Sequence, residues 1–335
     1  MAVSYSFASM RIRILEGQLL SPAFMDRLIN SENSEDFLAI LKETAYSRVL
    51  EKEDGIGSFE DCLAEELKNR AEILSDLIEE DWLKKFIFAQ YDLHNLKVLI
   101  KEELAKEMGI KPVNSPLFPF GSLNMAKVKD IIANPARNSD DPGLKSVLIK
   151  GMEVWKESQD AQALDLVVDS NYYTLIGQAA KKGKSSFLVD YAEKLADSIN
   201  ILSFFRAKRR GETKDFMART LVKGGKLNDD AFIKFYSMEN IDFSKYFSKA
   251  GLGFDFDKEL EEYSSSKDIT RLEKARDNMV SSLANKANQF REGPEVLFAY
   301  FTKVENEIKN LRIIMSAKRA GLGLDAIKER IRAYA

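Results

Sequence analysis

One short motif occurs three times in this sequence, and the repetition constrains the fold more than any other feature. The motif reads NLKVLIK at 95–101, NILSFFR at 200–206 and NLRIIMS at 310–316, and we call these three segments the boxes. Their first residues are Asn95, Asn200 and Asn310, so the period is nearly constant along the chain. Apolar residues recur in and around the boxes at helical spacing. Each box therefore predicts one helix of a unit that occurs three times.

Two acidic landmarks recur together with the boxes. A single acid stands three residues before each asparagine, at Asp92, Asp197 and Glu307. Two acids four residues apart precede each asparagine by 34–37 residues, and we call them the acidic pairs: Asp61 with Glu65, Asp165 with Asp169, and Glu273 with Asp277. Side chains four residues apart share one face of a helix. Each unit is therefore expected to contain an acidic-pair helix followed by a long box helix.

A turn marked by glycine and a short helix are expected after each box. The turns are Gly121-Ser-Leu-Asn124, Gly225-Lys-Leu-Asn228 and, closer to its box, Gly323-Leu-Asp325. In each, an Asn or Asp precedes a short segment of helical periodicity, which is typical of a helix N-cap. The N-terminal residues 11–15 and 34–46 are interpreted as the back half of a fourth unit.

The chain is predicted to be all-α. It has 17 glycines and 7 prolines in 335 residues, where average usage would give about 40 in total. Three like units can bury their apolar faces in line, as a solenoid, or around an axis, as a closed ring. A period of roughly 105 residues exceeds the roughly 34–47 residues of helix-pair solenoids and indicates three lobes. We expect lobe boundaries at 1–133 for the N-terminal half-unit with repeat 1, 134–240 for repeat 2 and 241–335 for repeat 3.

Composition excludes several classes of function. Cys62 and His94 are the single cysteine and histidine, so we expect no Cys/His metal site, no disulfide framework and no Cys–His nucleophile. The 50 basic and 53 acidic residues are interspersed and leave a net charge of −3, which disfavours nucleic-acid binding. No run of about 18 apolar residues predicts a membrane span. We expect a soluble intracellular protein that reaches a membrane only by docking onto something embedded there.

Two features could suggest an active site, and a structural role is favoured for both. The segment GQAAKKGKS at 177–185 resembles a phosphate loop, but it has five residues between its glycines where the Walker pattern has four. The acidic pairs could act as acid and base or contact a partner, but their occurrence in every unit favours a scaffold. Asp165 lies in an apolar stretch and should need a cation from a neighbouring box helix or a helix N-terminus. We therefore predict no catalytic residues and no cofactor.

The boxes also predict scaffold and interface residues. Asparagine is a mediocre helix former, so the three box asparagines are expected to hydrogen-bond a neighbouring helix or loop backbone. The second and third boxes run on into AKRRG at 207–211 and AKRAG at 317–321. Cations at a helix C-terminus are favoured by the helix dipole, and the alternative is contact with an acidic partner. The candidate partner-interface residues are Arg206, Lys208, Arg209, Lys318 and Arg319.

With these landmarks the chain resembles the C subunit of bacterial and archaeal V-type (A-type) ATP synthases, the counterpart of the d subunit in eukaryotic vacuolar ATPases. The resemblance is carried by RIRILEGQLL at 11–20, FAQYDLHNLKVLIK at 88–101, and EIKNLRIIMSAKRAGL at 307–322 with IKERIR at 327–332. It covers the chain end to end, including the repeat. Repeat 1 departs from the pattern, because LAKEMG at 104–109 replaces the basic helix end.

The resemblance implies a funnel-shaped, non-catalytic subunit of the central rotor stalk, with its lobes around a pseudo-three-fold axis. Such a subunit caps the membrane rotor ring on its cytoplasmic side and receives the shaft, formed by the D and F subunits, in its open mouth. One copy per complex, no cofactor and membrane association only through the ring are implied. The alternatives are a generic helical-repeat scaffold for protein–protein interaction and, as a third possibility, an enzyme that uses the carboxylate pairs.

Overall fold

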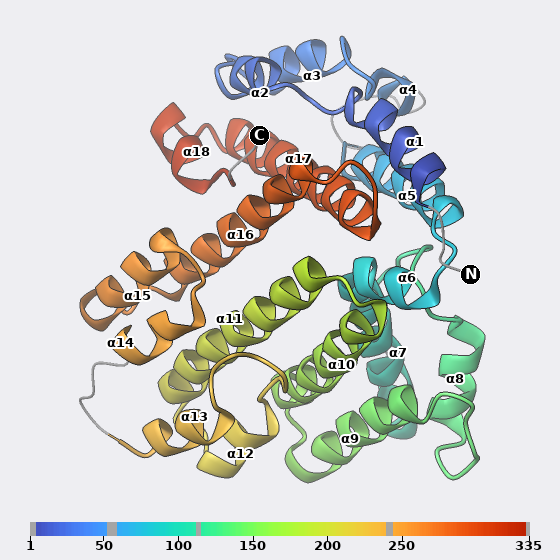
Figure 1. Cartoon of the computed structure of the whole chain (residues 1–335), viewed down its shortest axis with the longest axis vertical. Coiled ribbons are helices and arrows are strands. Elements are labelled where there is room, and N and C mark those ends of the chain that lie inside the picture. Colours follow the sequence, from blue (N-terminus) through green and yellow to red (C-terminus); the bar gives the residue numbers. More distant parts are fainter. Residues whose placement is uncertain (1–4, 52–58, 112–114, 239–243, 333–335) are drawn as a thin grey trace. The chain divides into compact units, whose positions relative to one another are not determined.

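The computed structural model of the chain describes residues 5–51, 59–111, 115–238 and 244–332 (Figure 1). Within these ranges every regular element is a helix, which confirms the predicted all-α class. Contacts divide the chain into two compact units, which we describe separately. Unit 1 comprises residues 1–79 and 274–335, and unit 2 comprises residues 80–273.

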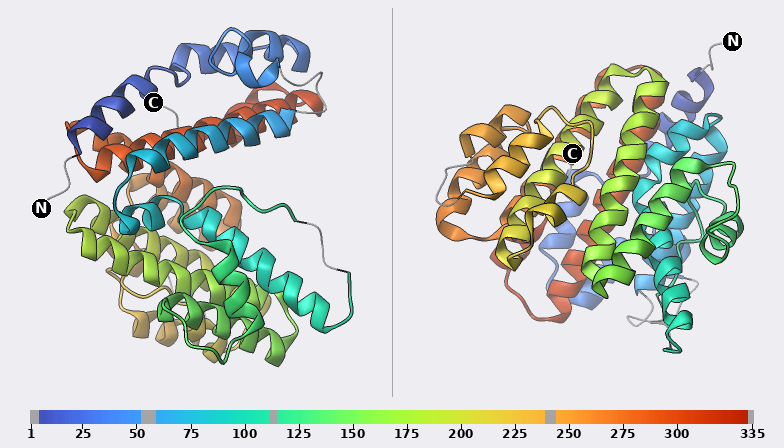
Figure 2. Two further views of the ribbon diagram at one scale, coloured as in Figure 1. Left: turned by 90° about the vertical axis from the view of Figure 1, so that its right-hand side faces the viewer. Right: turned by 90° about the horizontal axis from the view of Figure 1, so that it is seen from below.

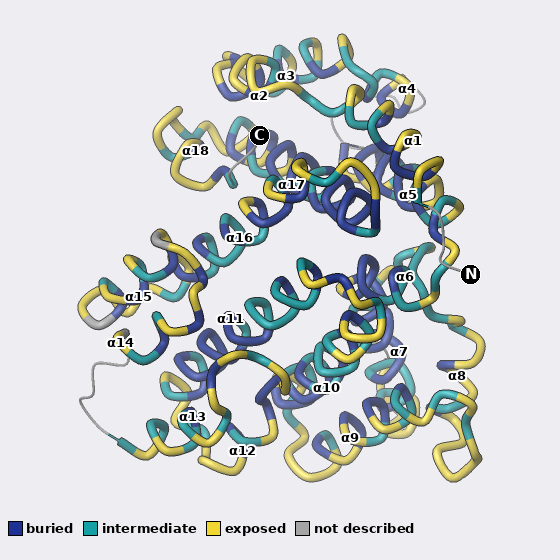
Figure 3. Tube along the Cα trace, in the orientation of Figure 1, coloured by how far each residue is buried: buried dark blue, intermediate teal, exposed yellow. Residues whose placement is uncertain are grey.

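Unit 1 is built around one long, largely buried helix. Its elements are α1 (Ser6–Glu16), α2 (Pro22–Ile29), α3 (Ser34–Leu41), α4 (Ser47–Leu50), α5 (Phe59–Leu77), most of α16 (Ile269–Lys286), η3 (Ala287–Gln289), α17 (Pro294–Arg319) and α18 (Leu324–Arg330). In α17, 17 of 26 residues are buried, and it contacts α5, α1, α3 and α18. Figure 2 shows α5 running beside α17, and Figure 3 shows how much of α17 is covered. The third box therefore lies on the central helix of unit 1.

Unit 2 contains the first two boxes. Its elements are α6 (Asp81–Ile87), α7 (Ala89–Glu107), α8 (Met125–Ala133), α9 (Pro142–Ser158), α10 (Ala161–Gly183), α11 (Ser186–Arg210), α12 (Lys214–Arg219), α13 (Asp229–Tyr236), α14 (Ser244–Phe247), η2 (Ser248–Ala250), α15 (Phe254–Ser266) and the start of α16. The most extensively packed helix is α10, which contacts α9, α11, α6 and α7. The first box lies on α7 and the second on α11.

All three box helices stop in the same way. Gly109, Gly211 and Gly321 follow α7, α11 and α17 with φ of +67°, +70° and +64°. This left-handed conformation costs glycine nothing, whereas a side chain would be strained, so it ends the helix and turns the chain. The common stop shows that LAKEMG in repeat 1, although it keeps only Lys106 of the basic residues, ends its helix as the other two boxes do.

Candidate functional site

Each box asparagine makes two hydrogen bonds to one backbone residue of a following loop. Asn200 Nδ2 donates to the carbonyl of Val222 at 2.9 Å, and Asn200 Oδ1 accepts from its N–H at 2.8 Å. Asn95 makes the same two bonds with Phe118, at 3.0 and 2.9 Å, and Asn310 with Arg332, at 3.1 and 2.9 Å. The asparagines are at most 1% exposed. The amide therefore pairs as a peptide group would and holds the loop 22–23 residues further along against the box helix.

The acids that precede the asparagines bind a second turn. Asp92 Oδ1 accepts from the backbone N–H groups of Ser122 and Leu123 at 2.9 and 3.2 Å. Asp197 accepts from those of Lys226 and Leu227 at the same two distances. The next residue in each turn is the N-cap asparagine of a short helix: Asn124 accepts from Ala126 and Lys127, and Asn228 from Asp230. The first two predicted N-caps are thus confirmed.

The glycines of these two turns are needed because the acid lies against them. A Cβ added at Gly121 would stand 2.3 Å from Asp92 Oδ1, and one added at Gly225 would stand 2.1 Å from Asp197 Oδ1. Real Cβ atoms do not approach other atoms so closely, so the carboxylate or the turn would have to move. The close approach of backbone to carboxylate explains why a glycine recurs at this position in both repeats.

The third acid has different partners. Glu307 Oε2 accepts from the backbone N–H of Leu20 at 2.5 Å, and Oε1 accepts from the Tyr46 hydroxyl at 2.8 Å. The predicted cap at Asp325 is wrong, because α18 begins at Leu324 with Gly323 in the N-cap position and no side-chain cap. The physical reason is that α18 occupies the place after its box that α12, and not α13, occupies in repeat 2, and where Thr213 caps α12 the N-cap position of α18 is Gly323, which has no side chain. The turn that binds the third acid therefore comes from elsewhere in the chain.

Burial raises the pKa of all three acids, against the opposing effect of their hydrogen bonds. The pKa of Asp92 is raised by burial although Ser122 donates to it twice. Burial raises the pKa of Asp197 to about 6 and that of Glu307 to about 7. A carboxylate surrounded by apolar side chains loses hydration that a few N–H donors only partly replace. All three groups anchor the packing, and Glu307 also lines a cavity of about 370 Å³ together with Leu20 and Lys303.

The second acidic pair contacts the first box helix. Asp165 lies 2.7 Å from Lys101 Nζ, and Asp169 Oδ1 accepts from Lys97 Nζ at 2.8 Å. This is the kind of partner that the sequence predicts for Asp165. Burial raises the pKa of Asp169, with Lys97 acting in the opposite direction. Because both ion pairs are partly exposed, each stabilises the fold by at most about 1 kcal/mol.

The third acidic pair also reaches the box helix of the preceding repeat, and a residue next to the first pair reaches the third box. Glu273 of the third pair forms an ion pair with Arg206 at the end of the second box. In the first pair Asp61 is exposed, and its neighbour Glu60 lies 2.7 Å from Arg312 of the third box.

The remaining members of these pairs have local partners. Glu65 lies 3.7 Å from Lys68 on its own helix. Burial acts to raise the pKa of Asp277, but the nearby cations Arg276 and Arg332 outweigh it and hold this pKa below its ordinary value. The second and third acidic pairs thus connect separate elements, and no two of the pairs are brought together in one cleft.

The candidate interface cations divide into two groups. Arg206 pairs with Glu273, Lys208 Nζ donates to the carbonyl of Met238 at 2.7 Å, and Lys318 Nζ donates to the carbonyls of Ile29 and Ser31. These three residues are half-buried and form the first group, whereas Arg209 and Arg319 are exposed and form the second.

The other chemistry-bearing residues do not form a site. Gly177 lies inside α10, which ends at Gly183, and Ser185 caps α11 by accepting from Leu188, so 177–185 is a helix end and a short turn and not a phosphate loop. Cys62 contacts the carbonyl of Val49, and His94 that of Pro116. Among the residues that the structure describes, no group of His, Cys, Asp or Glu could hold a metal ion. None of the described helices combines the length and hydropathy needed to span a membrane.

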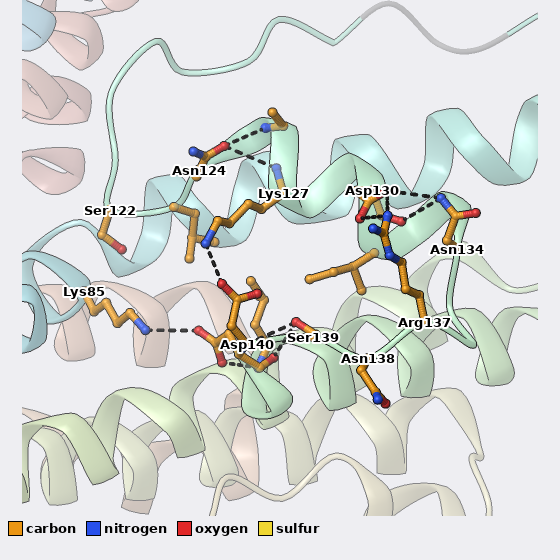
Figure 4. Close-up of a pocket in the computed structure, with 15 residues that line it drawn as sticks. Lys85, Ser122, Asn124, Lys127, Asp130, Asn134, Arg137, Asn138, Ser139 and Asp140 are labelled. Atoms are coloured by element: carbon orange, nitrogen blue, oxygen red, sulfur yellow. Dashed lines mark hydrogen bonds and ion pairs between the residues drawn. The ribbon is translucent and has the colours of Figure 1, made fainter.

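One polar cleft, of about 490 Å³, lies between α8 and α9 (Figure 4). Its three cations each face a carboxylate: Lys85 lies 3.2 Å from Asp141, Lys127 lies 2.7 Å from Asp140, and Arg137 lies 3.4 Å from Asp130. The cations are neutralised by these neighbours, so the cleft offers an anionic ligand little net attraction.

The sequence predicts a cation from a box helix beside Asp165, but it leaves unnamed both the lysines that bind the second acidic pair and the tyrosines that bind two of the buried acids. The lysines Lys97 and Lys101 lie within the first box and could have been assigned as partners from the shared helical face. The Tyr172 hydroxyl donates to Asp92 at 3.1 Å, and Tyr46 supplies the corresponding group to Glu307. No local signal distinguishes these two tyrosines from others, because the contact joins segments 80 and 261 residues apart.

Comparison with known proteins agrees with the resemblance seen in the sequence. The C subunit of the V-type sodium ATPase of Enterococcus hirae is 24% identical over 324 residues, covering 96% of both chains. The C subunit of the A-type ATP synthase of Thermococcus kodakarensis is 22% identical, over 97% of this chain and 89% of that one. The corresponding A-type chain of Methanocaldococcus jannaschii is 23% identical, over 97% and 85%. The sequence profile of the ATP synthase (C/AC39) subunit family matches residues 8–330. The chain therefore belongs to this family, whose members are structural stalk subunits of V- and A-type ATPases and not catalytic ones.

Proposed function

We propose that this chain is the rotor adaptor of a V- or A-type ATPase, joining the shaft, formed by the D and F subunits, to the membrane rotor ring. The family match over residues 8–330 carries the proposal. The buried asparagines and acids of the box helices support it, because they hydrogen-bond loops and turns of this chain. Among the described residues they do not form a catalytic site. A subunit of this kind transmits torque through its packing. The generic helical-repeat scaffold is not favoured by the family match.

The proposal includes three lobes around a pseudo-three-fold axis, forming a funnel with boundaries near residues 133 and 240. One recurring contact supports this arrangement. The acidic-pair helices α10, α16 and α5 contact the box helices α7, α11 and α17, respectively. Each is the box helix of the preceding repeat, if the third repeat is taken to precede the first. Repeats arranged around an axis are expected to contact one another in this cyclic way, with the last repeat in contact with the first.

An exposed apolar stripe on α1 supports contact with a partner. Phe7, Met10 and Ile14 are 72%, 65% and 58% exposed and lie on one face of the helix. The opposite face, which includes Ile12, is buried in unit 1. Large apolar side chains gathered on a surface mark protein interaction sites. We assign the α1 stripe and the exposed cations Arg209 and Arg319 to the interface with the shaft or the ring.

The adaptor role is tested by removing the chain from membranes that carry the rest of the complex. ATP hydrolysis by the soluble head should persist, whereas ATP-driven ion transport should be lost, because the catalytic sites and the ion path lie in other chains. Adding the purified chain with the shaft subunits should restore transport. Pumping that continues without the chain would refute the proposal. In this proposal the chain lies at the cytoplasmic face of the membrane, attached through the ring, with one copy per complex.

Charge reversal tests the interface assignment separately. Arg209→Glu and Arg319→Glu should weaken coupling, while lowering the stability of the isolated chain by no more than about 1 kcal/mol each, the cost of a reversed charge at a helix C-terminus. Lys156→Glu in the last turn of α9 is a suitable control, since it is also a basic residue near a helix end. Normal coupling in both arginine variants would contradict the interface assignment. The two arginines would then have a role only at the ends of their own helices.

A further inference from the structure

The third acid binds a turn from the opposite end of the sequence. In repeats 1 and 2 the acid accepts from a turn about 30 residues further along the same repeat. Glu307 instead accepts from Leu20, 287 residues earlier. We call residues 17–31 the seam segment. It contains a turn, the N-cap Ser21 and the helix α2.

The seam segment aligns with residues 224–238 of repeat 2 without a gap. The alignment places Leu20 on Leu227, whose N–H binds Asp197. In the same register Ser21, which caps α2, falls on Asn228, which caps α13. The helix α2 (Pro22–Ile29) then falls on α13 (Asp229–Tyr236) with no difference in either helix end.

A second contact keeps the same register. The repeat places the α11 residues Asp197, Asn200 and Lys208 on Glu307, Asn310 and Lys318 of α17. Lys208 Nζ donates to the carbonyl of Met238, and Lys318 Nζ donates to that of Ser31. Ser31 and Met238 are the last residues of the two aligned segments, so they match each other as well. On α11 and on α17 alike, the acid therefore binds the turn at the start of the aligned segment, and the lysine binds the end of its short helix.

The third acid is a glutamate where repeat 2 has an aspartate, and this difference has a steric explanation. Where repeat 2 has Gly225 lying against its aspartate, the seam segment has Gln18, which carries a Cβ. The third acid is a glutamate, which is longer by one methylene group. Its carboxylate can reach the Leu20 N–H from further away, and Tyr46 replaces the second backbone donor.

We propose that the seam segment is the turn and short helix of the third repeat, supplied from the N-terminal end, and that Glu307 and Lys318 form its binding site on α17. The ligand class of this site is a peptide that offers one backbone N–H and, about ten residues later, carbonyls at the end of a short helix. Two of the three repeats are then closed by continuous chain, and the third is closed by non-covalent contacts between distant segments. This inference does not depend on the proposed rotor function.

The test converts the intramolecular contact into a measurable complex. A recognition sequence for a site-specific protease is inserted at residues 52–58, between α4 and α5, and the folded full-length protein is then cut. The fragment that carries the seam segment should stay bound through size-exclusion chromatography. In the double variant Glu307→Ala with Lys318→Met, it should dissociate at least ten times faster.

The matched control is Asp197→Ala with Lys208→Met, which removes the same two groups from repeat 2. After cutting, this control should retain the fragment as the unaltered protein does. The proposal is overturned if the fragment leaves the unaltered protein immediately, or if both double variants release it at the same rate. Should the Glu307 variant fail to fold, Lys318→Met alone is compared with Lys208→Met by hydrogen exchange. The single variant should deprotect residues 17–31 selectively, and equal protection in the two variants would also overturn the proposal.

Discussion

Replacing Asn200 by alanine tests whether the box asparagines act as backbone anchors. The substitution removes two hydrogen bonds and leaves the N–H and the carbonyl of Val222 without them, at a residue that is only 1% exposed. Each unsatisfied buried group lowers the free energy of unfolding by about 1–3 kcal/mol. Alanine is the better helix former and offsets roughly 0.5 kcal/mol of this loss. With two such groups, the net loss of stability should be about 1.5–5.5 kcal/mol, with a central value of about 3.5 kcal/mol.

Thermal and chemical unfolding measure this loss. With an unfolding entropy of about 2.1 cal/mol/K per residue, a 335-residue chain that unfolds as one unit should lose roughly 5 °C in Tm. Hydrogen exchange should show the Val222 amide losing its protection. Asn200→Asp should be about as destabilising as alanine, because it keeps the acceptor for the Val222 N–H but turns a carboxylate oxygen toward the Val222 carbonyl.

The matched control is Asn171→Ala, another mid-helix asparagine. Its amide donates to the carbonyl of Val167 in its own helix and accepts from Lys150 near the surface. Its loss should change stability by less than about 1 kcal/mol. If Asn171→Ala and Asn200→Ala lowered the Tm equally, the reasoning about buried backbone partners would be refuted.

A glycine, a buried acid and the α1 stripe each give a further prediction. Gly225→Ala places a Cβ 2.1 Å from Asp197 Oδ1 and should cost about 2–4 kcal/mol in urea unfolding, whereas Gly177→Ala, inside α10 with nothing within 4 Å of the added Cβ, should be neutral or stabilising. Burial raises the pKa of Glu307 from 4.5 to about 7, so the folded chain keeps a proton that the unfolded chain releases between these values. Stability therefore falls as pH rises through this window, and Glu307→Gln should reduce that fall in urea midpoints measured from about pH 5 to about pH 8. Ile14→Ser should leave the Tm within about 1 °C, because the side chain is exposed, but should weaken restoration of coupled transport, and unchanged restoration would remove the α1 stripe from the interface.

The sequence by itself determined the helices, the repeat and the type of contact that its polar residues make. Helical periodicity and a recurring box are local properties, so they could be read without knowledge of packing. The same holds for the asparagines: an amide in the middle of a buried helix must find a partner, and the backbone is the commonest one available. The sequence also predicts the cation beside Asp165, because an unpaired carboxylate there would be costly.

Only the tertiary structure decided which copies of the repeat meet. The sequence places an acidic pair and a box in every unit, and any pair could face any box. Packing joins Asp165 to Lys101 of the preceding repeat and Glu307 to Leu20 from the far end of the chain. The assignment of a third turn at 323–325 was wrong for the same reason. A repeat defines positions within a unit, but contacts between units depend on the path of the chain in three dimensions, which no spacing in the sequence records.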